Sequence, residues 1–328
     1  MKIITGGAGF IGSAICWKLN QLGFTDIFIV DEDTKGTKQN NLSGLKYTDY
    51  FDKLDLLKQI EKGAINYSVD AVYHMGACSS TTENNMEYLM ENNVEYSKSL
   101  GKWCLNKNAK YIYASSGATY GDGGFGFSDD TELIPRLKPL NKYGLSKQLF
   151  DLWVLENKYD GKFVGLKYFN VFGPNENHKG DMRSMVNKAY SQIKSTGKLK
   201  LFRSLKPEFK DGEQQRDFVY VKDAVDMTLF FDPSDKTGGS KTGIYNIGSG
   251  TASSWLQAAR AVFAAMRVEE KIEFIDMPEN IMNQYQYYSK AEMEKLVSAG
   301  YNKPCMKLED SIKDYVQNYI MKGEYLRL

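Results

Sequence analysis

The chain has 328 residues, 42% of them hydrophobic, and its 42 basic and 41 acidic side chains leave a net charge of +1. This length allows either one large core or a two-lobed molecule. The balanced charge argues against nucleic acid or an anionic membrane as a partner, and no apolar run approaches the roughly 20 residues of a membrane span.

The cysteines and histidines narrow the kinds of site that the chain can hold. Only two histidines occur, His74 and His178, so a histidine-rich metal site is excluded and we expect no metal. The cysteines contain no CxxC pair, which favours four buried thiols in a reduced, cytoplasmic compartment. A strand beginning at residue 2 predicts that no signal peptide is present. The cysteines are Cys16, Cys78, Cys104 and Cys305.

The first 31 residues predict a dinucleotide-binding unit. Residues 2–5 form an apolar run typical of a buried strand, residues 6–12 are rich in glycine, and residues 11–22 carry apolar side chains at helical spacing. Residues 27–30 predict a second strand, and Asp31 follows about 20 residues after the glycines, where an acid would meet the adenosine ribose. The glycines would let the backbone approach a pyrophosphate at the helix N-terminus. The alternative is a tight turn in an α/β protein that binds no dinucleotide.

The elements that follow alternate between strands and helices. This alternation predicts an α/β fold, a Rossmann-type doubly wound parallel sheet with helices on both faces. The pattern comprises a polar loop at 33–44, strands near 47–51, 71–75, 111–114 and 163–168, and helices near 86–105 and 143–156.

From about residue 170 the pattern loosens into short helices and strands. We interpret this part as a smaller mixed α/β substrate-binding lobe that interleaves with the first. Residues 1–170, with returning segments near 215–250, are expected to form the dinucleotide-binding Rossmann domain. Residues 171–328 are expected to form the interleaved substrate domain.

Lysines near the second strand bear on which nicotinamide cofactor binds. Lys35, Lys38 and Lys53 could bind the 2′-phosphate of NADP, or they could be solvated surface residues. Asp31 at the strand end is instead the usual mark of NAD, so the two signals conflict.

Tyr143 and Lys147 are four residues apart and therefore share one face of a predicted helix. The tyrosine reference pKa of about 10 makes a poor base near neutral pH. An ammonium about 4 Å away is worth about 4 kcal/mol, or roughly three pKa units, before desolvation offsets part of it. The resulting phenolate could accept a hydroxyl proton as hydride leaves the adjoining carbon, and Ser116 could hydrogen-bond the developing oxyanion. Alone, this spacing is a common coincidence on surface helices; its context after a glycine turn favours catalysis.

Together these motifs resemble those of the extended short-chain dehydrogenase/reductase family. The resemblance covers most of the chain and implies a Rossmann lobe with a smaller lobe for nucleotide sugars. It rests on residues 5–12, Asn92-Asn93, Ser115-Ser116, Tyr143 with Lys147, and the runs 168–174 and 216–221.

Two further segments, 76–83 and 178–180, are similar to the branch of the family that inverts C6 of the heptose in ADP-heptose. The resemblance implies that a bound NADP, with NAD possible, removes hydride from C6 and returns it to the other face, without net redox change. Hydride delivery to either face leaves oxygen protons to be managed in two geometries, so Tyr143 and Lys179 would act as two acid/base groups. Lys179 could otherwise be a plain surface lysine, and His178 is expected to pack in a loop. The resemblance also implies a homopentamer.

The family pattern implies specific ligand contacts. The catalytic residues would be Tyr143, Lys147, Lys179 and Ser116. The cofactor would be bound by Gly6, Gly9, Phe10, Ile11, Gly12, Asp31, Glu32, Lys38, Lys53, Met75, Gly76, Ala77, Cys78, Ser79, Asn92, Lys147, Val171 and Lys179. The substrate would be bound by Ser116, Asn170, Asp181, Lys188, Phe202, Arg203, Ser204, Arg216 and Tyr285.

The chain departs from the family pattern at several positions. Met75 stands where relatives commonly have Glu, and Glu32 replaces the usual Asn and adds negative charge near the proposed phosphate. Residues 205–215 are longer than the pattern, which blurs the alignment just before them. Arg216 could hold a diphosphate bidentately or form a surface salt bridge with Asp217.

Other activities compete with C6 inversion. Another nucleotide-sugar epimerase, such as a hexose 4-epimerase, fits the same scaffold, as does a 4,6-dehydratase. A dehydratase normally carries an acidic pair after the serine strand end, whereas Ser116 is followed by Gly117-Ala118-Thr119. A non-catalytic dinucleotide-sensing regulator would generally lose the Tyr143 and Lys147 pair.

Overall fold

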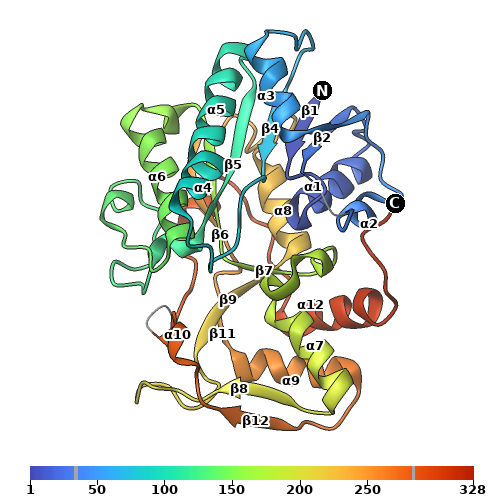
Figure 1. Ribbon diagram of the computed structural model, residues 1–328, viewed down its shortest axis with the longest axis vertical. Helices are drawn as coiled ribbons and strands as arrows, with labels where there is room; N and C mark the ends of the chain where they lie inside the picture. The colour runs from blue at the N-terminus through green and yellow to red at the C-terminus, as the bar shows by residue number, and fades with distance from the viewer. Residues whose placement is uncertain (33–35, 283–284) are drawn as a thin grey trace.

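The computed structural model describes residues 1–32, 36–282 and 285–328, and its upper part in Figure 1 is a seven-stranded sheet. All neighbouring strands in this sheet run parallel. In spatial order they are β10 (Gly243–Ile247), β6 (Val164–Tyr168), β5 (Lys110–Ser116), β4 (Ala71–His74), β1 (Lys2–Thr5), β2 (Ile27–Asp31) and β3 (Asp49–Asp52).

Helices cover both faces of the sheet because alternate strand residues point to opposite sides. Ile4 and Tyr73 pack in the core beneath α1 (Phe10–Gln21) and α8 (Val221–Phe230). Their neighbours Ile3 and Val72 pack in a second core against the helices of the opposite face. Those helices are α3 (Lys53–Glu61), α5 (Tyr96–Lys107) and α6 (Lys142–Glu156). The doubly wound parallel sheet expected from the alternating pattern is thereby confirmed.

The lower part of Figure 1 is built from two small sheets and the helices around them. One sheet has the order β11 (Ala252–Ser254), β9 (Gln215–Tyr220), β7 (Asn170–Phe172), and the other pairs β12 (Ile272–Ile275) with β8 (Leu199–Phe202). The helices are α7 (Met185–Thr196), α9 (Trp255–Met266), α10 (Glu279–Met282) and α12 (Leu308–Asp314). Helix α11 (Glu294–Ser298) lies instead beside β10 of the large sheet, where Lys295 Nζ donates to the Ile244 carbonyl at 2.8 Å. This mixture matches the smaller α/β lobe of the predicted fold class.

The stretch 33–44, expected to be a polar loop, contains helix α2 (Gln39–Leu42). A 3-10 helix covers Asn177–Met182 in the smaller lobe. In α2 the Asn41 side chain is buried and donates to the carbonyl oxygen of Ala8 at 2.9 Å. The helix over 86–105 is confirmed, although it has a π-helical turn at Met90–Glu95 between α4 (Met86–Leu89) and α5.

The C-terminal segment returns to the Rossmann part of the molecule, beside α1 and α2 (Figure 1). Trp17 Nε1 donates to the carbonyl oxygen of Arg327 at 3.0 Å, and the Leu326 amide donates to Asn175 Oδ1 at 3.0 Å. The two lobes are thus joined by the end of the chain as well as by its crossings near residues 170 and 220.

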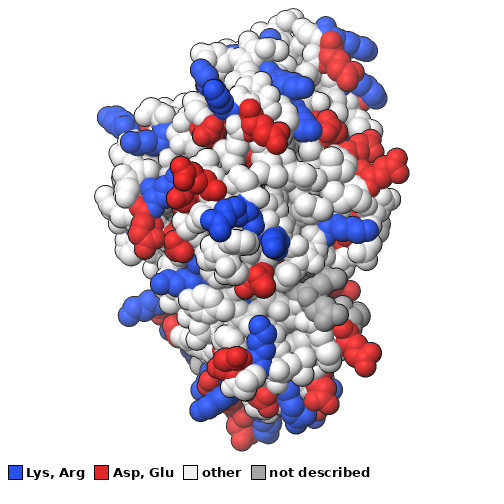
Figure 2. Space-filling view, turned by 90° about the vertical axis from the view of Figure 1, so that its left-hand side faces the viewer, with Lys and Arg blue, Asp and Glu red and all other residues white. Residues whose placement is uncertain are grey.

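Basic and acidic side chains are interspersed on the face shown in Figure 2. No described helix combines the length and apolar character needed to cross a bilayer.

The expectation of four buried thiols is wrong for two of them, because Cys78 and Cys305 are only half-buried while Cys16 and Cys104 are buried.

Candidate active site

Two cavities lie beyond the carboxyl ends of the sheet strands, and Ala77 lines both of them. The larger has a volume of about 790 Å³ and runs from the glycine turn into the smaller lobe. The smaller has a volume of about 160 Å³ and lies beside Asp31 and Gly76. A doubly wound sheet is expected to bind its ligands at this edge.

The glycine turn fits a dinucleotide because side chains would close it. A Cβ on Gly12 would lie 2.2 Å from the carbonyl oxygen of Gly6, and a Cβ on Gly6 would lie 2.6 Å from the Gly76 amide nitrogen. Gly6 also has a φ of +64°, which favours glycine. Helix α1 has no side-chain hydrogen bond at its Gly9 cap, so its first amides are available to a phosphate. Gly9 and Gly12 shape this turn without lining either cavity.

Asp31 is engaged by the protein on both carboxylate oxygens. Oδ2 accepts from the Ala8 amide at 2.9 Å, while Oδ1 accepts from the Glu32 amide at 2.7 Å and from Lys38 Nζ at 2.7 Å. Lys53 forms an ion pair with Glu32 and donates to Asn92 Oδ1 at 3.1 Å. The predicted residues therefore meet in the smaller cavity as two acids and two lysines; Lys35 lies outside the described residues.

Residues 75–79 form one wall of the site, and Asn93 holds this segment in place. Asn93 Oδ1 accepts from the Cys78 amide at 2.8 Å, and Asn93 Nδ2 donates to the Cys78 carbonyl at 3.0 Å and to Ser146 Oγ at 3.0 Å. This clamp ties the wall to α6, the helix that carries the predicted catalytic pair. Met75, Ala77 and Ser79 line the larger cavity.

Tyr143, Ser116 and Lys147 all line the larger cavity. Burial raises the pKa of Tyr143 above its usual value of 10, and the hydrogen-bonding Ser116 hydroxyl lowers it in part. This net direction is opposite to that expected from the spacing with Lys147. Lys147 Nζ donates instead to the Ala114 carbonyl at 2.9 Å, and burial lowers its own pKa to about 8 against the opposing charge of Asp151.

A buried charge network lies behind Lys147, and the sequence reasoning missed it. Asp151 accepts from Lys167 Nζ at 2.6 Å, from Ser115 Oγ at 2.7 Å and from the Tyr113 hydroxyl at 3.0 Å. The Lys167 and Asp151 side chains are both fully buried. Two signals were available in the sequence. Lys167 lies inside an apolar strand, and Asp151 lies one turn beyond Lys147 on the same helix face.

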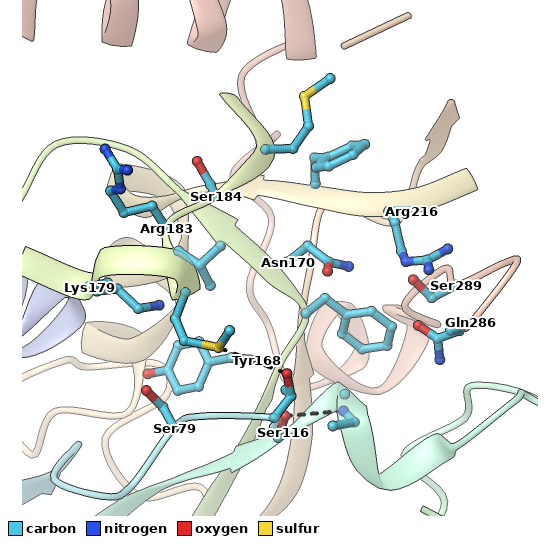
Figure 3. Close-up of a pocket in the computed structure, with 18 of the residues that line it drawn as sticks. Ser79, Ser116, Tyr168, Asn170, Lys179, Arg183, Ser184, Arg216, Gln286 and Ser289 are labelled. Atoms are coloured by element: carbon cyan, nitrogen blue, oxygen red, sulfur yellow. Dashed lines mark hydrogen bonds between the residues drawn. The ribbon is translucent and has the colours of Figure 1, made fainter. Parts of the chain in front are cut away.

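Lys179 enters the larger cavity from the 3-10 helix, on the side of the glycine turn (Figure 3). Its Nζ lies 5.4 Å from the centroid of the Phe10 ring. Burial lowers its pKa, and the nearby Glu176 carboxylate opposes the shift. Lys179 is therefore half-buried at the site, and the plain surface alternative is wrong.

His178 packs against the cofactor side of the protein. Its Nδ1 lies 3.1 Å from Asn41 Nδ2, the amide that also donates to the Ala8 carbonyl. Burial, with the charges of Lys38 and Lys179, lowers the pKa of His178 to about 4. A neutral packing residue is the result, as expected for this histidine.

Arg216 is buried without an acidic partner in the described ranges 1–32, 36–282 and 285–328. Its guanidinium carbon lies 5.6 Å from the Trp255 ring centroid and 5.2 Å from that of Tyr285. Asp217 accepts instead from the amides of Ser249 at 2.7 Å and Ala291 at 2.9 Å. The surface salt bridge considered for Arg216 is therefore wrong. A buried cation that lacks a carboxylate is suited to an anionic ligand.

Comparison with known proteins identifies the family. Residues 2–248 match the model of the NAD dependent epimerase/dehydratase family. The chain belongs to this family. It is 49% identical over 325 residues to the ADP-L-glycero-D-manno-heptose-6-epimerase of Nitratidesulfovibrio vulgaris strain DP4, with 99% of each chain covered.

Solved structures of the family are similar over nearly the whole chain. The ADP-L-glycero-D-manno-heptose-6-epimerase of Helicobacter pylori has a TM-score of 0.79 and 29% identity, covering 97% of this chain and 95% of that one. The UDP-glucose 4-epimerase of Thermus thermophilus, in complex with NAD, has a TM-score of 0.74 and 25% identity, covering 96% and 98%. The chain is accordingly an isomerase of the epimerase class, and the predicted family is confirmed.

The structure of this epimerase also shows how the remaining predicted residues lie. Arg203 and Ser204 lie outside both cavities, where Arg203 Nη1 pairs with Asp276 at 3.2 Å and the Ser204 amide donates to Asp211 at 2.8 Å. Asp211, in the long segment that follows, also lies 3.8 Å from Arg203 Nε, so carboxylates outside the cavities hold both residues. The predicted residues that line the larger cavity are Phe10, Ile11, Met75, Ala77, Ser79, Ser116, Tyr143, Lys147, Asn170, Val171, Lys179, Asp181, Lys188, Phe202, Arg216 and Tyr285.

Several lining residues had not been predicted. Gln214, Trp255, Gln286 and Ser289 line the end of the larger cavity that lies in the smaller lobe. Gln214 lies two positions before Arg216, and Gln286 directly follows Tyr285. Both would have been found if the positions next to these predicted residues had also been considered. Trp255 and Ser289 carry no comparable signal in the sequence.

Proposed function

We propose that the chain converts ADP-D-glycero-D-manno-heptose to ADP-L-glycero-D-manno-heptose by inverting C6 through a keto intermediate, which supplies a lipopolysaccharide core precursor. The observation that carries this proposal is that Tyr143 and Lys179 line one cavity from different elements, with the buried Arg216 in the same cavity. Two acid/base groups suit a ketone that must be reduced from either face. The ADP-heptose epimerases among the relatives support the choice of substrate.

The protein's own residues manage the oxygen protons of the reaction. Tyr143 Oη, hydrogen-bonded by Ser116, exchanges the proton of the C6 hydroxyl in one geometry. Lys179 Nζ serves the other geometry, and burial favours its neutral, proton-accepting form by lowering its pKa. Lys147, one turn further along α6, contributes positive charge to the same cavity. When bound, the nicotinamide cofactor supplies reversible hydride transfer at C6.

We propose NADP as the cofactor in preference to NAD. Asp31 is already committed to the Ala8 and Glu32 amides and to Lys38, so it has little capacity left for ribose hydroxyls. Lys38 and Lys53 line the same small cavity and would bind a 2′-phosphate. Glu32 opposes this preference through its ion pair with Lys53.

We also propose how the chain divides into two domains. Residues 1–170, with segments near 215–250, form the NADP-binding domain, and residues 171–328 form the substrate domain.

Arg216 binds the substrate diphosphate, because its buried guanidinium has a bidentate geometry that matches phosphate oxygens. We further propose a homopentamer and, from the four free thiols, a reducing cytoplasmic setting.

The deciding experiment is incubation of the purified chain with ADP-D-glycero-D-manno-heptose, followed by chromatographic separation of the C6 epimers. Approach to an equilibrium mixture supports the proposal. No conversion, with the nicotinamide site saturated, would reject it. Interconversion of UDP-glucose and UDP-galactose in a parallel reaction would then establish the 4-epimerase alternative.

A further inference from the structure

Ser289 belongs to a segment that crosses the cavity end of β9. The Gln215 amide donates to the Tyr287 carbonyl at 2.9 Å, and the Ser289 amide donates back to the Gln215 carbonyl at 3.2 Å. Two residues later the Ala291 amide donates to Asp217 at 2.9 Å. These bonds fix the Ser289 backbone on both sides, at a position where the residue lines the larger cavity.

The Ser289 hydroxyl is buried but unused. The residue is 2% exposed, and its Oγ has no hydrogen-bond partner among residues 1–32, 36–282 and 285–328. A buried hydroxyl without a partner is unfavourable, and nearly all such groups in folded proteins are paired. Because Ser289 lines a ligand cavity, a ligand atom is a natural partner.

The neighbour of this hydroxyl is the guanidinium of Arg216. Arg216 Nη1 donates to the Gln215 carbonyl oxygen at 2.8 Å, the same oxygen that accepts from the Ser289 amide at 3.2 Å. Sharing one acceptor holds the two residues side by side, and Figure 3 shows both at the same edge of the cavity, with Gln286. An unused hydroxyl donor thus lies beside a buried cation that has no acidic partner.

We propose that the Ser289 hydroxyl is a substrate-binding group that donates a hydrogen bond to a diphosphate oxygen held by Arg216. The assignment rests on the proposed function, because it takes the ligand to be a nucleoside diphosphate sugar. A phosphate oxygen accepts from a guanidinium and a hydroxyl at once. A sugar hydroxyl would satisfy Ser289 but would leave the Arg216 charge unpaired.

The test is Ser289→Ala in the full chain, saturated with nicotinamide cofactor so that added ADP reaches only the substrate cavity. Calorimetric titration is expected to show ADP binding weakened about tenfold, equivalent to about 1.4 kcal/mol, with adenosine binding unchanged. The melting temperature without ADP should stay the same or rise, since the substitution removes an unpaired buried hydroxyl. Turnover of ADP-heptose should show a raised KM and an unchanged kcat.

A matched control is Ser249→Ala, which removes a hydroxyl that donates to Asp217 at 2.8 Å. This variant should lose stability and keep the ADP affinity. Equal ADP affinity in Ser289→Ala and the wild type, equal weakening of adenosine, a lowered melting temperature of Ser289→Ala, or no ADP binding by the wild type would each overturn the assignment. If ADP binding weakens as expected but ADP-heptose is not converted, the proposed function fails and the Ser289 assignment stands.

Discussion

Replacing Asp151 by asparagine tests the charge network that lies behind the reacting groups. Asp151 and Lys167 are fully buried and 2.6 Å apart. Removing one charge leaves the other buried and unpaired, which typically costs about 3–5 kcal/mol. For a chain of this size, that loss lowers the melting temperature by about 4–7 °C. Differential scanning fluorimetry measures the shift, and adding Lys167→Met should recover part of it because the unpaired ammonium is then removed.

The same substitution should change the pH profile. Burial lowers the pKa of Lys147 to about 8, and Asp151 opposes that shift. The protonated form of Lys147 is present below this pKa and is lost as pH rises through it. The wild-type kcat/KM should therefore fall above about pH 8, and the fall should begin at lower pH in Asp151→Asn. Two results for Asp151→Asn would refute this reasoning. One is a melting temperature within about 2 °C of wild type; the other is a kcat/KM that falls at high pH in the same range as in the wild type.

The remaining predictions concern the proton-transfer groups and the cofactor. Tyr143→Phe and Lys179→Met should each lower kcat for C6 inversion by about 10²–10⁴ with little change in ADP affinity; near-normal turnover of either variant would remove that residue from the mechanism. Glu32→Gln frees Lys53 from its ion pair and should shift the ratio of NADP to NAD affinity toward NADP by a few fold, measured by fluorescence titration; an unchanged ratio would contradict the assigned phosphate site. Gly12→Ala places a Cβ 2.2 Å from a backbone oxygen in the turn and should abolish cofactor binding, so cofactor retained at wild-type affinity would contradict the fit of the turn.

The doubly wound sheet could be predicted because its signals are local. Strands such as β1 and β2 are short apolar runs bounded by turns, and α1 carries its apolar side chains at helical spacing. Glycine and an acid at the expected separation then mark the cofactor end of the sheet. These patterns survive in the sequence because burial on both faces requires them.

The features that could not be predicted depend on tertiary contacts. Helix α2 is polar in sequence, yet its Asn41 is buried and bonded to Ala8. The direction of the Tyr143 pKa shift follows from how deeply the fold buries it. Arg203 was placed by family pattern across a segment of unusual length, and the fold directs it to Asp276 instead.

The central claim is that C6 is inverted by hydride transfer between the substrate and a nicotinamide cofactor that stays bound during turnover. The most direct measurement is conversion of ADP-D-glycero-D-manno-heptose in D₂O, followed by NMR of the epimer. The account predicts an inverted C6 that carries no deuterium, because hydrogen removed as hydride does not exchange with solvent. Deuterium at C6 of the product would show inversion by proton abstraction and would contradict the account.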